Sequence, residues 1–449
     1  MEIKKLLESL TELSDKKNLS AIKSLLSQEN QKDIAECMEQ LSADKIAVVF
    51  RMLSKDVAAD VFSELSPEAQ EIIIHSVTDS ELTAIIGDLW LDDAVDLVEE
   101  MPAGVVKRIL KNAPPETRAL INRFLNYPED SAGSIMTAEF VDLKQHMSVS
   151  DAIARLRTKG KDSRSVYTCY VVSESRRLEG VITLRELLFA PDNELVGQLM
   201  NKDVITVRTA QDKEIAAKTM MKYDLITLPV VDTENRLVGI ITSDDVMDVI
   251  EEEATEDFEK MAAMQPSEKP YLKTNVFALA RKRIGWLLIL MISGMITGGI
   301  LGKFEAAFST LPLLVTFIPM ITDTGGNSGS QSSTLIIRGM AVGEITPRDL
   351  PKVLWKELRV SLIVGIVLSA VNYVRLIITY PGNEGIALTV ALAMLATVVL
   401  AKTAGGVLPI AAKLLHADPA IMAAPLITTI VDAVSLVCYF LIAQALLPI

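Results

Sequence analysis

Cysteine and histidine are scarce in this chain of 449 residues, which contains three of each. Cys37, Cys169 and Cys438 lie far apart and form no CxxC pair. The sequence therefore indicates neither a disulfide framework nor a zinc site, and this cysteine usage suits a reducing cytosol. A phosphate-binding GxxxxGKS or GxxxxGKT loop is also missing from the sequence, which argues against a pump driven by nucleotide hydrolysis.

Negative charge exceeds positive charge in residues 1–272. They carry 50 of the 58 Asp and Glu residues but 31 of the 44 Lys and Arg residues, a net charge of −19. Residues 273–449 carry the other 8 acids and 13 bases, a net charge of +5. We expect no nucleic acid partner, because phosphates need cationic cover. An acidic surface favours cations as partners instead.

The first residues lack the apolar core of a signal peptide, so we expect no cleaved leader. Long apolar stretches follow Lys273, and each approaches the ~20 residues that a membrane-spanning helix requires. These stretches are 284–302, 311–337, 358–380, 386–412 and 419–447. They predict an α-helical transmembrane bundle of five spans within a lipid bilayer.

Basic residues gather on alternate sides of these stretches. One group precedes the first stretch, a second group separates the second stretch from the third, and Lys413 separates the fourth from the fifth. Lys303 and Arg375 oppose the pattern. Because cytosolic loops are enriched in Lys and Arg, we expect a multi-pass protein of the inner (plasma) membrane. Its N-terminus is then cytosolic and Ile449 lies outside.

Three charged residues lie deep within the apolar stretches: Asp323, Lys402 and Asp432. A carboxylate at mid-bilayer is costly unless it faces water, a partner or an ion. Asp432 lies one helical turn after Thr428, which suits a water-filled path for cations. The alternative is a polar contact between helices, for instance between Lys402 and an acidic residue.

Small and hydroxyl-bearing residues fill the second stretch between Pro319 and Ser333. Such residues let backbones approach closely, and irregular backbone at membrane depth occurs only in a protein interior or beside water. We therefore expect exposed carbonyl groups beside a pore. The alternative is a seam for helix packing, which is the interpretation that we favour for Gly294 and Gly298. The expected pore-lining residues are Asp323, Asn327, Gln331 and Thr428.

An internal repeat with a period of about 64 residues occupies residues 132–255. The segment Ser134–Thr137 recurs as Gln198–Asn201, and each copy ends in Leu-x-Gly-x-Ile-Thr, at 178–183 and at 237–242. Short β-branched runs between helical patterns predict a small α/β unit. The repeat resembles a tandem pair of CBS modules, which implies a regulatory sensor. Some such modules bind adenine nucleotides, which leaves ATP open as a ligand here.

Helical spacing of apolar residues dominates residues 1–128, with proline-marked helix starts at Pro67, Pro102 and Pro115. We expect an all-α, superhelical domain of short stacked helices. Its acidic cluster is, taken alone, typical of a solvated face. The cluster comprises Asp88, Asp92, Asp93 and Asp96.

A second acidic cluster follows Asp244 and shares one helical face, because its members are three or four residues apart. They are Asp245, Asp248, Glu252, Glu256 and Glu259. Like charges at this spacing destabilise a helix. A hard divalent cation that prefers carboxylates, such as Mg²⁺, is the simplest compensation. The alternative is an acidic linker exposed to solvent.

The whole chain resembles the MgtE family of magnesium channels or transporters in the order of its parts. Three local matches carry the resemblance: Glu129–Thr137, the run Gly326-Asn327-x-Gly329-x-Gln331, and Asp418-Pro419-Ala420 leading to Asp432. The implied parts are a helical N domain (1–130), CBS modules (131–199 and 200–250), an acidic connecting or plug helix (251–280) and a transmembrane pore domain (281–449). The resemblance also implies a homodimer in which Asp432 holds a hydrated Mg²⁺ ion.

Cytosolic Mg²⁺ sites that sense the ion are a further implication of the resemblance. In the acidic helix the matching residues are Asp245, Asp248, Glu256 and Asp257. Close by, they are Asp224 with Asp212 or Glu214. In the N domain they are Asp92 and Asp96, with Asp93 as a further candidate.

We therefore expect no enzyme but a magnesium-selective channel or transporter that admits Mg²⁺ and closes when Mg²⁺ binds the acidic cytosolic domains. Two alternatives stay open. One is a transporter of another divalent cation, such as Co²⁺ or Mn²⁺, and the other is a membrane-bound Mg²⁺ sensor without transport. Softer metals lack their preferred ligands, because no His or Cys cluster lies in the apolar stretches.

Overall fold

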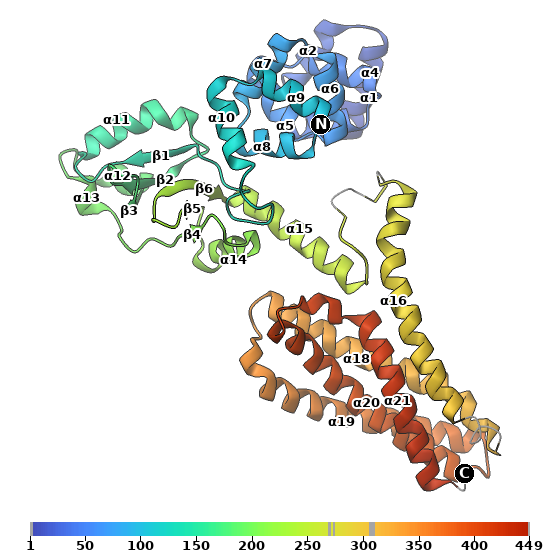
Figure 1. Cartoon of the computed structure of the whole chain (residues 1–449). Coiled ribbons are helices and arrows are strands. Elements are labelled where there is room, and N and C mark those ends of the chain that lie inside the picture. Colours follow the sequence, from blue (N-terminus) through green and yellow to red (C-terminus); the bar gives the residue numbers. More distant parts are fainter. Residues whose placement is uncertain (1–2, 268–270, 273, 305–309, 448–449) are drawn as a thin grey trace. The chain divides into compact units, whose positions relative to one another are not determined.

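The computed structural model describes residues 3–267, 271–272, 274–304 and 310–447. The chain divides into two compact units, Met1–Ile250 and Glu251–Ile449. The first unit holds a cluster of short helices and two small sheets, and the second holds long helices (Figure 1). This arrangement confirms the predicted fold class of a helical domain, paired α/β modules and a helical bundle.

Short helices make up the first part of unit 1 (Figure 1). They are α1 (Ile3–Asp15), α2 (Leu19–Leu26), α3 (Gln31–Glu39), α4 (Ala43–Phe50), α5 (Lys55–Ser63), α6 (Pro67–Ser76), α7 (Asp79–Asp88), α8 (Leu91–Glu100), α9 (Ala103–Asn112) and α10 (Pro115–Phe124). The prolines start α6 and α10 as expected, since their fixed φ suits the first helical position. At α7, Thr78 and Glu81 form a capping box. Each helix is too short to be stable alone, so the shared apolar core stabilises the set.

The two repeat copies form two three-stranded sheets of identical topology. The first contains β1 (Phe140–Leu143), α11 (Val149–Lys159), η1 (Gly160–Asp162), β2 (Ser165–Val172), β3 (Leu178–Thr183), α12 (Leu184–Phe189) and α13 (Val196–Leu199). The second contains β4 (Val207–Arg208), α14 (Lys213–Tyr223), β5 (Thr227–Val231), β6 (Leu237–Thr242) and α15 (Ser243–Met261). In each sheet the first strand pairs in parallel with the second, which pairs antiparallel with the third.

The repeated glycines show how the modules interlock. A Cβ on Gly239 of β6 would lie 2.7 Å from the carbonyl oxygen of Thr137, in the segment that opens the first module. A Cβ on Gly180 of β3 would lie 2.9 Å from the carbonyl oxygen of Asn201, which opens the second. Both segments bridge to the strand concerned. Each module is therefore completed by the opening segment of the other copy, which explains why both halves of the motif recur together.

The described part of unit 2 consists mainly of long helices (Figure 1). They are α16 (Val276–Lys303), η2 (Pro312–Phe317), α18 (Ile318–Ala341), η3 (Pro347–Asp349), α19 (Leu350–Thr379), α20 (Glu384–Leu414), η4 (Pro419–Met422) and α21 (Ala424–Leu446). Within the described residues, four helices are long and apolar enough to cross a membrane: Val276–Lys303, Pro347–Thr379, Glu384–Leu414 and Pro425–Leu446. The expected fifth span corresponds to α18, which is long enough but carries too many polar residues.

The helix bounds differ from the expected ones at the connecting segment. A single helix was expected over residues 251–280. Instead α15 begins at Ser243 and ends at Met261, and α16 begins at Val276, capped by the Asn275 side chain. Residues 268–270 and 273 of the expected helix lie outside the described residues.

The glycine-rich stretch in α18 is regular helix rather than irregular backbone. Its glycines serve close packing: a Cβ on Gly405 of α20 would lie 2.3 Å from the carbonyl oxygen of Gly329. The expectation of exposed carbonyl groups is therefore wrong, and the alternative of a packing seam is confirmed. Gly294 and Gly298 behave in the opposite way, since no described atom beyond the adjacent turns of α16 lies within 4 Å of a Cβ at either position.

Candidate functional site

Three of the expected pore residues lie on one face of α18. Asp323, Asn327 and Gln331 are each four residues apart, and all three are exposed in the single chain. On α21, Thr428 and Asp432 are also four residues apart, and both are partly buried. Polar stripes on membrane helices face a protein interior or water rather than lipid.

Close packing brings these two stripes together. A Cβ on Gly326 would lie 2.8 Å from the Thr428 methyl carbon, and one on Gly325 would lie 2.8 Å from Val431. Helices α18 and α21 can approach so closely only because these positions have no side chain. The Asp323 carboxylate is near enough to act electrostatically on Asp432. Two carboxylates and a hydroxyl in an apolar bundle supply the oxygen atoms that a hydrated divalent cation prefers.

A buried charged network lies at the Gln331 end of the α18 stripe. The Lys402 side chain of α20 is 4% exposed, and its Nζ lies 3.4 Å from Gln331 Oε1 and 3.5 Å from Ser332 Oγ. Ser332 Oγ donates a 2.6 Å hydrogen bond to Glu357 Oε2 of α19. Ser332 thus links a buried ammonium to a buried carboxylate, the polar contact between helices that the sequence left open for Lys402.

Glu357 is not identified from the sequence, because this residue lies in the basic segment between the second and third apolar stretches. The buried lysine was the available signal, since such a charge requires an acidic partner within the bundle.

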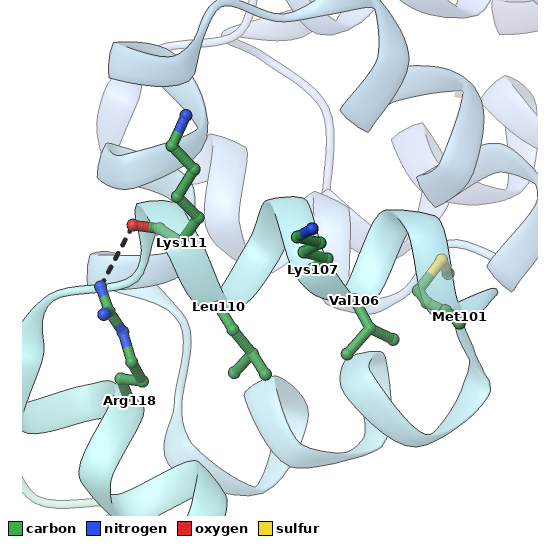
Figure 2. A pocket seen from close by; sticks show the side chains of 7 residues that line it. Met101, Val106, Lys107, Leu110, Lys111 and Arg118 are labelled. Atoms are coloured by element: carbon green, nitrogen blue, oxygen red, sulfur yellow. Dashed lines mark hydrogen bonds between the residues drawn. The ribbon is translucent and has the colours of Figure 1, made fainter.

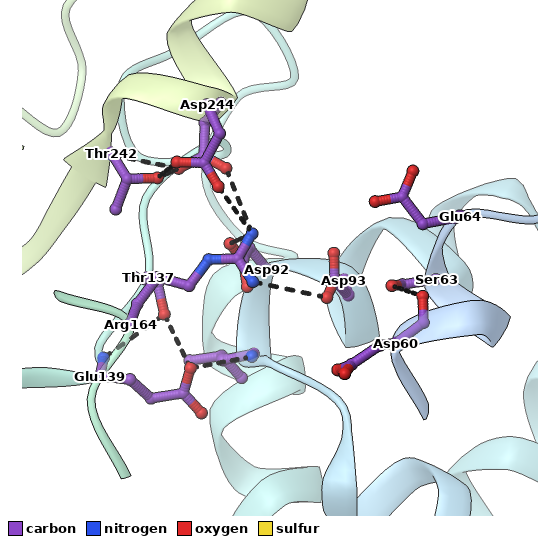
Figure 3. A network of polar contacts seen from close by, with 12 residues as sticks. Asp60, Ser63, Glu64, Asp92, Asp93, Thr137, Glu139, Arg164, Thr242 and Asp244 are labelled. Atoms are coloured by element: carbon purple, nitrogen blue, oxygen red, sulfur yellow. Dashed lines mark hydrogen bonds and ion pairs between the residues drawn. The ribbon is translucent and has the colours of Figure 1, made fainter. Parts of the chain in front are cut away.

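In unit 1, an arginine joins the N-terminal helices to the second CBS module (Figure 3). Arg164 immediately precedes β2, and its side chain is 20% exposed. Its guanidinium nitrogens contact four carboxylates: Asp92 at 3.8 Å, Asp93 at 4.0 Å, Asp244 at 3.3 Å and Asp245 at 3.9 Å. The first two belong to α8 and the last two to α15, so one cation bridges two domains.

The start of α8 is held at this junction by further contacts. The Arg164 guanidinium lies 5.5 Å from the centre of the Trp90 ring. The backbone N–H of Leu91 donates to Glu139 Oε2 at 3.2 Å, and the backbone N–H of Arg164 donates to the Glu139 carbonyl oxygen at 2.9 Å. Glu139 therefore fixes both α8 and the arginine that faces it.

Negative charge at the junction exceeds what Arg164 neutralises. Burial, followed by the charge of Asp92, raises the pKa of Asp93 to about 7 and that of Asp245 to about 6. Burial also raises the pKa of Asp92, whose carboxylate oxygens have no hydrogen-bond donor within the described residues. The junction thus holds more carboxylate groups than its single arginine can balance.

The other expected sensing residues do not converge in this structure. Asp212 caps the first turn of α14, Glu214 pairs with Lys218, and Asp224 ends the helix in a left-handed conformation. Asp212 and Asp224 are thus about 18 Å apart along one helix axis. Asp96 and Asp248 are exposed. Among the described residues, no three His, Cys, Asp or Glu side chains are arranged to hold a metal ion.

Within unit 2, Glu256 of α15 pairs with Lys260, whose Nζ also contacts Asp418 at 2.7 Å. The neighbouring Asp257 is partly buried. Asp418 caps η4, the short turn that leads into α21. The acidic helix therefore contacts the turn that precedes the Asp432 helix through a lysine, rather than through acidic residues alone.

A shallow hollow lies along α9 (Figure 2). Met101, Val106 and Leu110 supply its apolar floor. Arg118 Nη2 donates to the carbonyl oxygens of Lys111 at 3.1 Å and Ala113 at 2.8 Å, which caps the end of α9. These contacts give Arg118 a structural role. None of the candidate ion-binding residues lines the hollow.

Family comparisons agree with the order of the domains. The model of the divalent cation transporter family MgtE matches residues 318–442, and that of the MgtE intracellular N domain matches residues 29–130. The CBS domain model matches residues 132–193 and 196–252. A magnesium transporter MgtE from Thermus thermophilus is 38% identical over 357 residues, 80% of this chain and 79% of that protein. The chain belongs to the MgtE family.

A second MgtE family member, the magnesium transporter MgtE from Bacillus subtilis, is 34% identical over 84% of this chain and 83% of its own length. Among solved structures, the cytosolic domain of the Mg²⁺ channel MgtE in complex with ATP matches with a TM-score of 0.52. That match is at 37% identity over 54% of this chain and 99% of the solved one. The soluble part of a magnesium transporter matches with a TM-score of 0.53. That match is at 27% identity and covers 56% of this chain and 100% of the solved one. MgtE proteins are transporters rather than enzymes, and the apolar helices fit a multi-pass membrane protein.

Proposed function

We propose that this MgtE family member is a magnesium-selective channel or transporter for Mg²⁺ influx, which closes when cytosolic Mg²⁺ binds its acidic domains. The observation that carries the proposal is the pair of polar stripes on α18 and α21, which contain Asp323 and Asp432 and are packed together in an apolar bundle. The relatives named as magnesium transporters support Mg²⁺ as the ion.

Permeation needs no covalent chemistry in this proposal. A hydrated Mg²⁺ ion pauses at Asp432, and the oxygen atoms of Thr428, Asn327 and Gln331 take part in solvating it. A membrane potential of about 100 mV contributes roughly 4–5 kcal/mol to the inward movement of a divalent ion. The N-terminus then lies in the cytosol and the C-terminus outside, as the basic loops indicate.

Two protomers complete the path in this proposal. The α18 stripe is exposed in the single chain, although exposed carboxylate and amide groups at membrane depth are costly against lipid. A second copy would place this stripe beside water between the protomers. A homodimer therefore accounts for a polar face that one chain leaves uncovered.

Closure follows from the excess of carboxylates at the junction between α8 and α15. When cytosolic Mg²⁺ is abundant, it binds the junction around Asp92 and Asp245 and favours the compact arrangement. When Mg²⁺ is scarce, the carboxylates repel one another and the junction loosens. Because the cytosolic domain of the Mg²⁺ channel MgtE was solved in complex with ATP, ATP is also proposed as a ligand of this chain, with the CBS modules as its site.

Uptake into proteoliposomes tests the proposal. The wild-type chain should admit Mg²⁺ down an inward gradient when internal Mg²⁺ is low, and the Asp432→Asn variant should lose this uptake. Glu384→Gln, which removes the same charge from an exposed helix start, is the matched control and should retain it. Absence of wild-type uptake would favour a sensor without transport. Uptake of Co²⁺ or Mn²⁺ in preference to Mg²⁺ would favour the other divalent transporter.

A further inference from the structure

The position of Arg164 carries an inference about regulation. Its guanidinium lies among four carboxylates, two on α8 and two at the start of α15 (Figure 3). One positive charge faces four carboxylates, so the junction remains acidic with the arginine in place. No other Lys or Arg makes an ion pair with these four residues in the part of the chain that the structure describes.

We propose that Arg164 is a built-in counter-ion that holds α8 against α15 and so sets the Mg²⁺ concentration at which the junction closes. This inference rests on the proposed function. Arg164 supplies part of the attraction before any Mg²⁺ binds. Less free energy is then required from the ion, and closure occurs at a lower Mg²⁺ concentration.

The surroundings of Arg164 favour a cation that binds beside the arginine over a cation that displaces the arginine from the carboxylates. The ion-pair distances of 3.3–4.0 Å are long for a tight arginine–carboxylate contact. Both Asp92 carboxylate oxygens lack a hydrogen-bond donor within the described residues. Asp92 is therefore held near the arginine while both of its carboxylate oxygens stay available to a divalent ion.

The arginine side chain has two properties that a lysine lacks. Its planar guanidinium can stack on an aromatic ring and contact several carboxylates at once. Trp90, at the start of α8, supplies the ring. Charge alone would therefore reproduce only part of the effect.

The test measures uptake of isotopically labelled Mg²⁺ by the full-length protein in proteoliposomes at increasing internal Mg²⁺. The quantity compared is the internal concentration that halves the uptake. Arg164→Gln should raise this concentration about tenfold, within the range of typical coupling between sites. Arg164→Lys should give a smaller increase. Arg157→Gln, which removes the same charge from an exposed position on α11, should leave it unchanged.

A second readout reports on the junction itself. In a Trp286→Phe/Trp355→Phe background, Trp90 is the single tryptophan, and the Mg²⁺ midpoint of its fluorescence should shift with that of inhibition. If the wild type is inhibited but Arg164→Gln has an unchanged or lower midpoint, the counter-ion role is wrong and the proposed gating stands. If internal Mg²⁺ does not inhibit the wild type, the proposed gating itself is wrong.

Discussion

At the residue scale, the charged groups in the membrane helices fall into two kinds. Asp323 and Asp432 lie on neighbouring stripes of α18 and α21, and no cation balances them within the described residues. Lys402 and Glu357 are instead linked through Ser332 in a buried interhelical network. The first kind suits a passing ion, and the second suits a fixed structure. Acidic residues in the same bundle thus differ in role according to whether a neighbouring side chain balances their charge.

The Lys402 network gives a prediction about stability. Glu357→Gln or Lys402→Met alone leaves a buried charge without its counterpart, which typically costs about 3–5 kcal/mol. The double variant removes both charges, and its loss should be smaller than that of either single variant. Thermal unfolding of the purified protein in detergent would measure this. Additive losses in the double variant would show that the two side chains do not act as a pair.

At the element scale, glycine residues determine how closely the helices pack, because they have no side chain. Gly405 and Gly329 allow α20 and α18 to touch through their backbones, and Gly326 places α18 against Thr428 of α21. The glycine-rich run is therefore a structural requirement for bringing the two polar stripes together. The glycines of α16 have no such contact with the described residues outside their own helix.

A matched pair of substitutions tests this packing. Gly405→Ala should destabilise the bundle by about 1–3 kcal/mol or more, since its new methyl group would overlap the Gly329 backbone. Gly294→Ala should be neutral or stabilise by up to about 1 kcal/mol, because alanine favours helix and nothing in the chain opposes it. Thermal unfolding in detergent compares the two. Equal losses would contradict the packing account.

The sequence predicted the elements better than their contacts. Proline-marked helix starts, the repeat with its two Leu-x-Gly-x-Ile-Thr ends and the apolar stretches correspond to observed elements, because such signals are local. The regular helix of α18 was not predicted, since small residues are compatible with both a seam and irregular backbone. Arg164 was overlooked because its four acidic partners are distant in the chain and meet it only after folding.

At the scale of the whole molecule, two tasks are proposed for the two units of the chain. Unit 2 contains the proposed path at Asp432, and unit 1 contains the acidic junction at which Mg²⁺ is proposed to act. Asp245 belongs to the junction, where its carboxylate accepts hydrogen bonds from the Thr242 backbone and hydroxyl group. An Asp245→Asn substitution keeps an acceptor there and removes the charge. The two tasks should therefore be separable by substitution.

The most direct test measures Mg²⁺ uptake against internal Mg²⁺ concentration for three forms of the full-length protein. The wild type should transport at low internal Mg²⁺ and stop as it rises. Asp432→Asn should not transport at any concentration. Asp245→Asn/Asp248→Asn should transport at the wild-type rate at low internal Mg²⁺ but continue at concentrations that close the wild type. Unchanged inhibition in the double variant, or full transport by Asp432→Asn, would contradict the account.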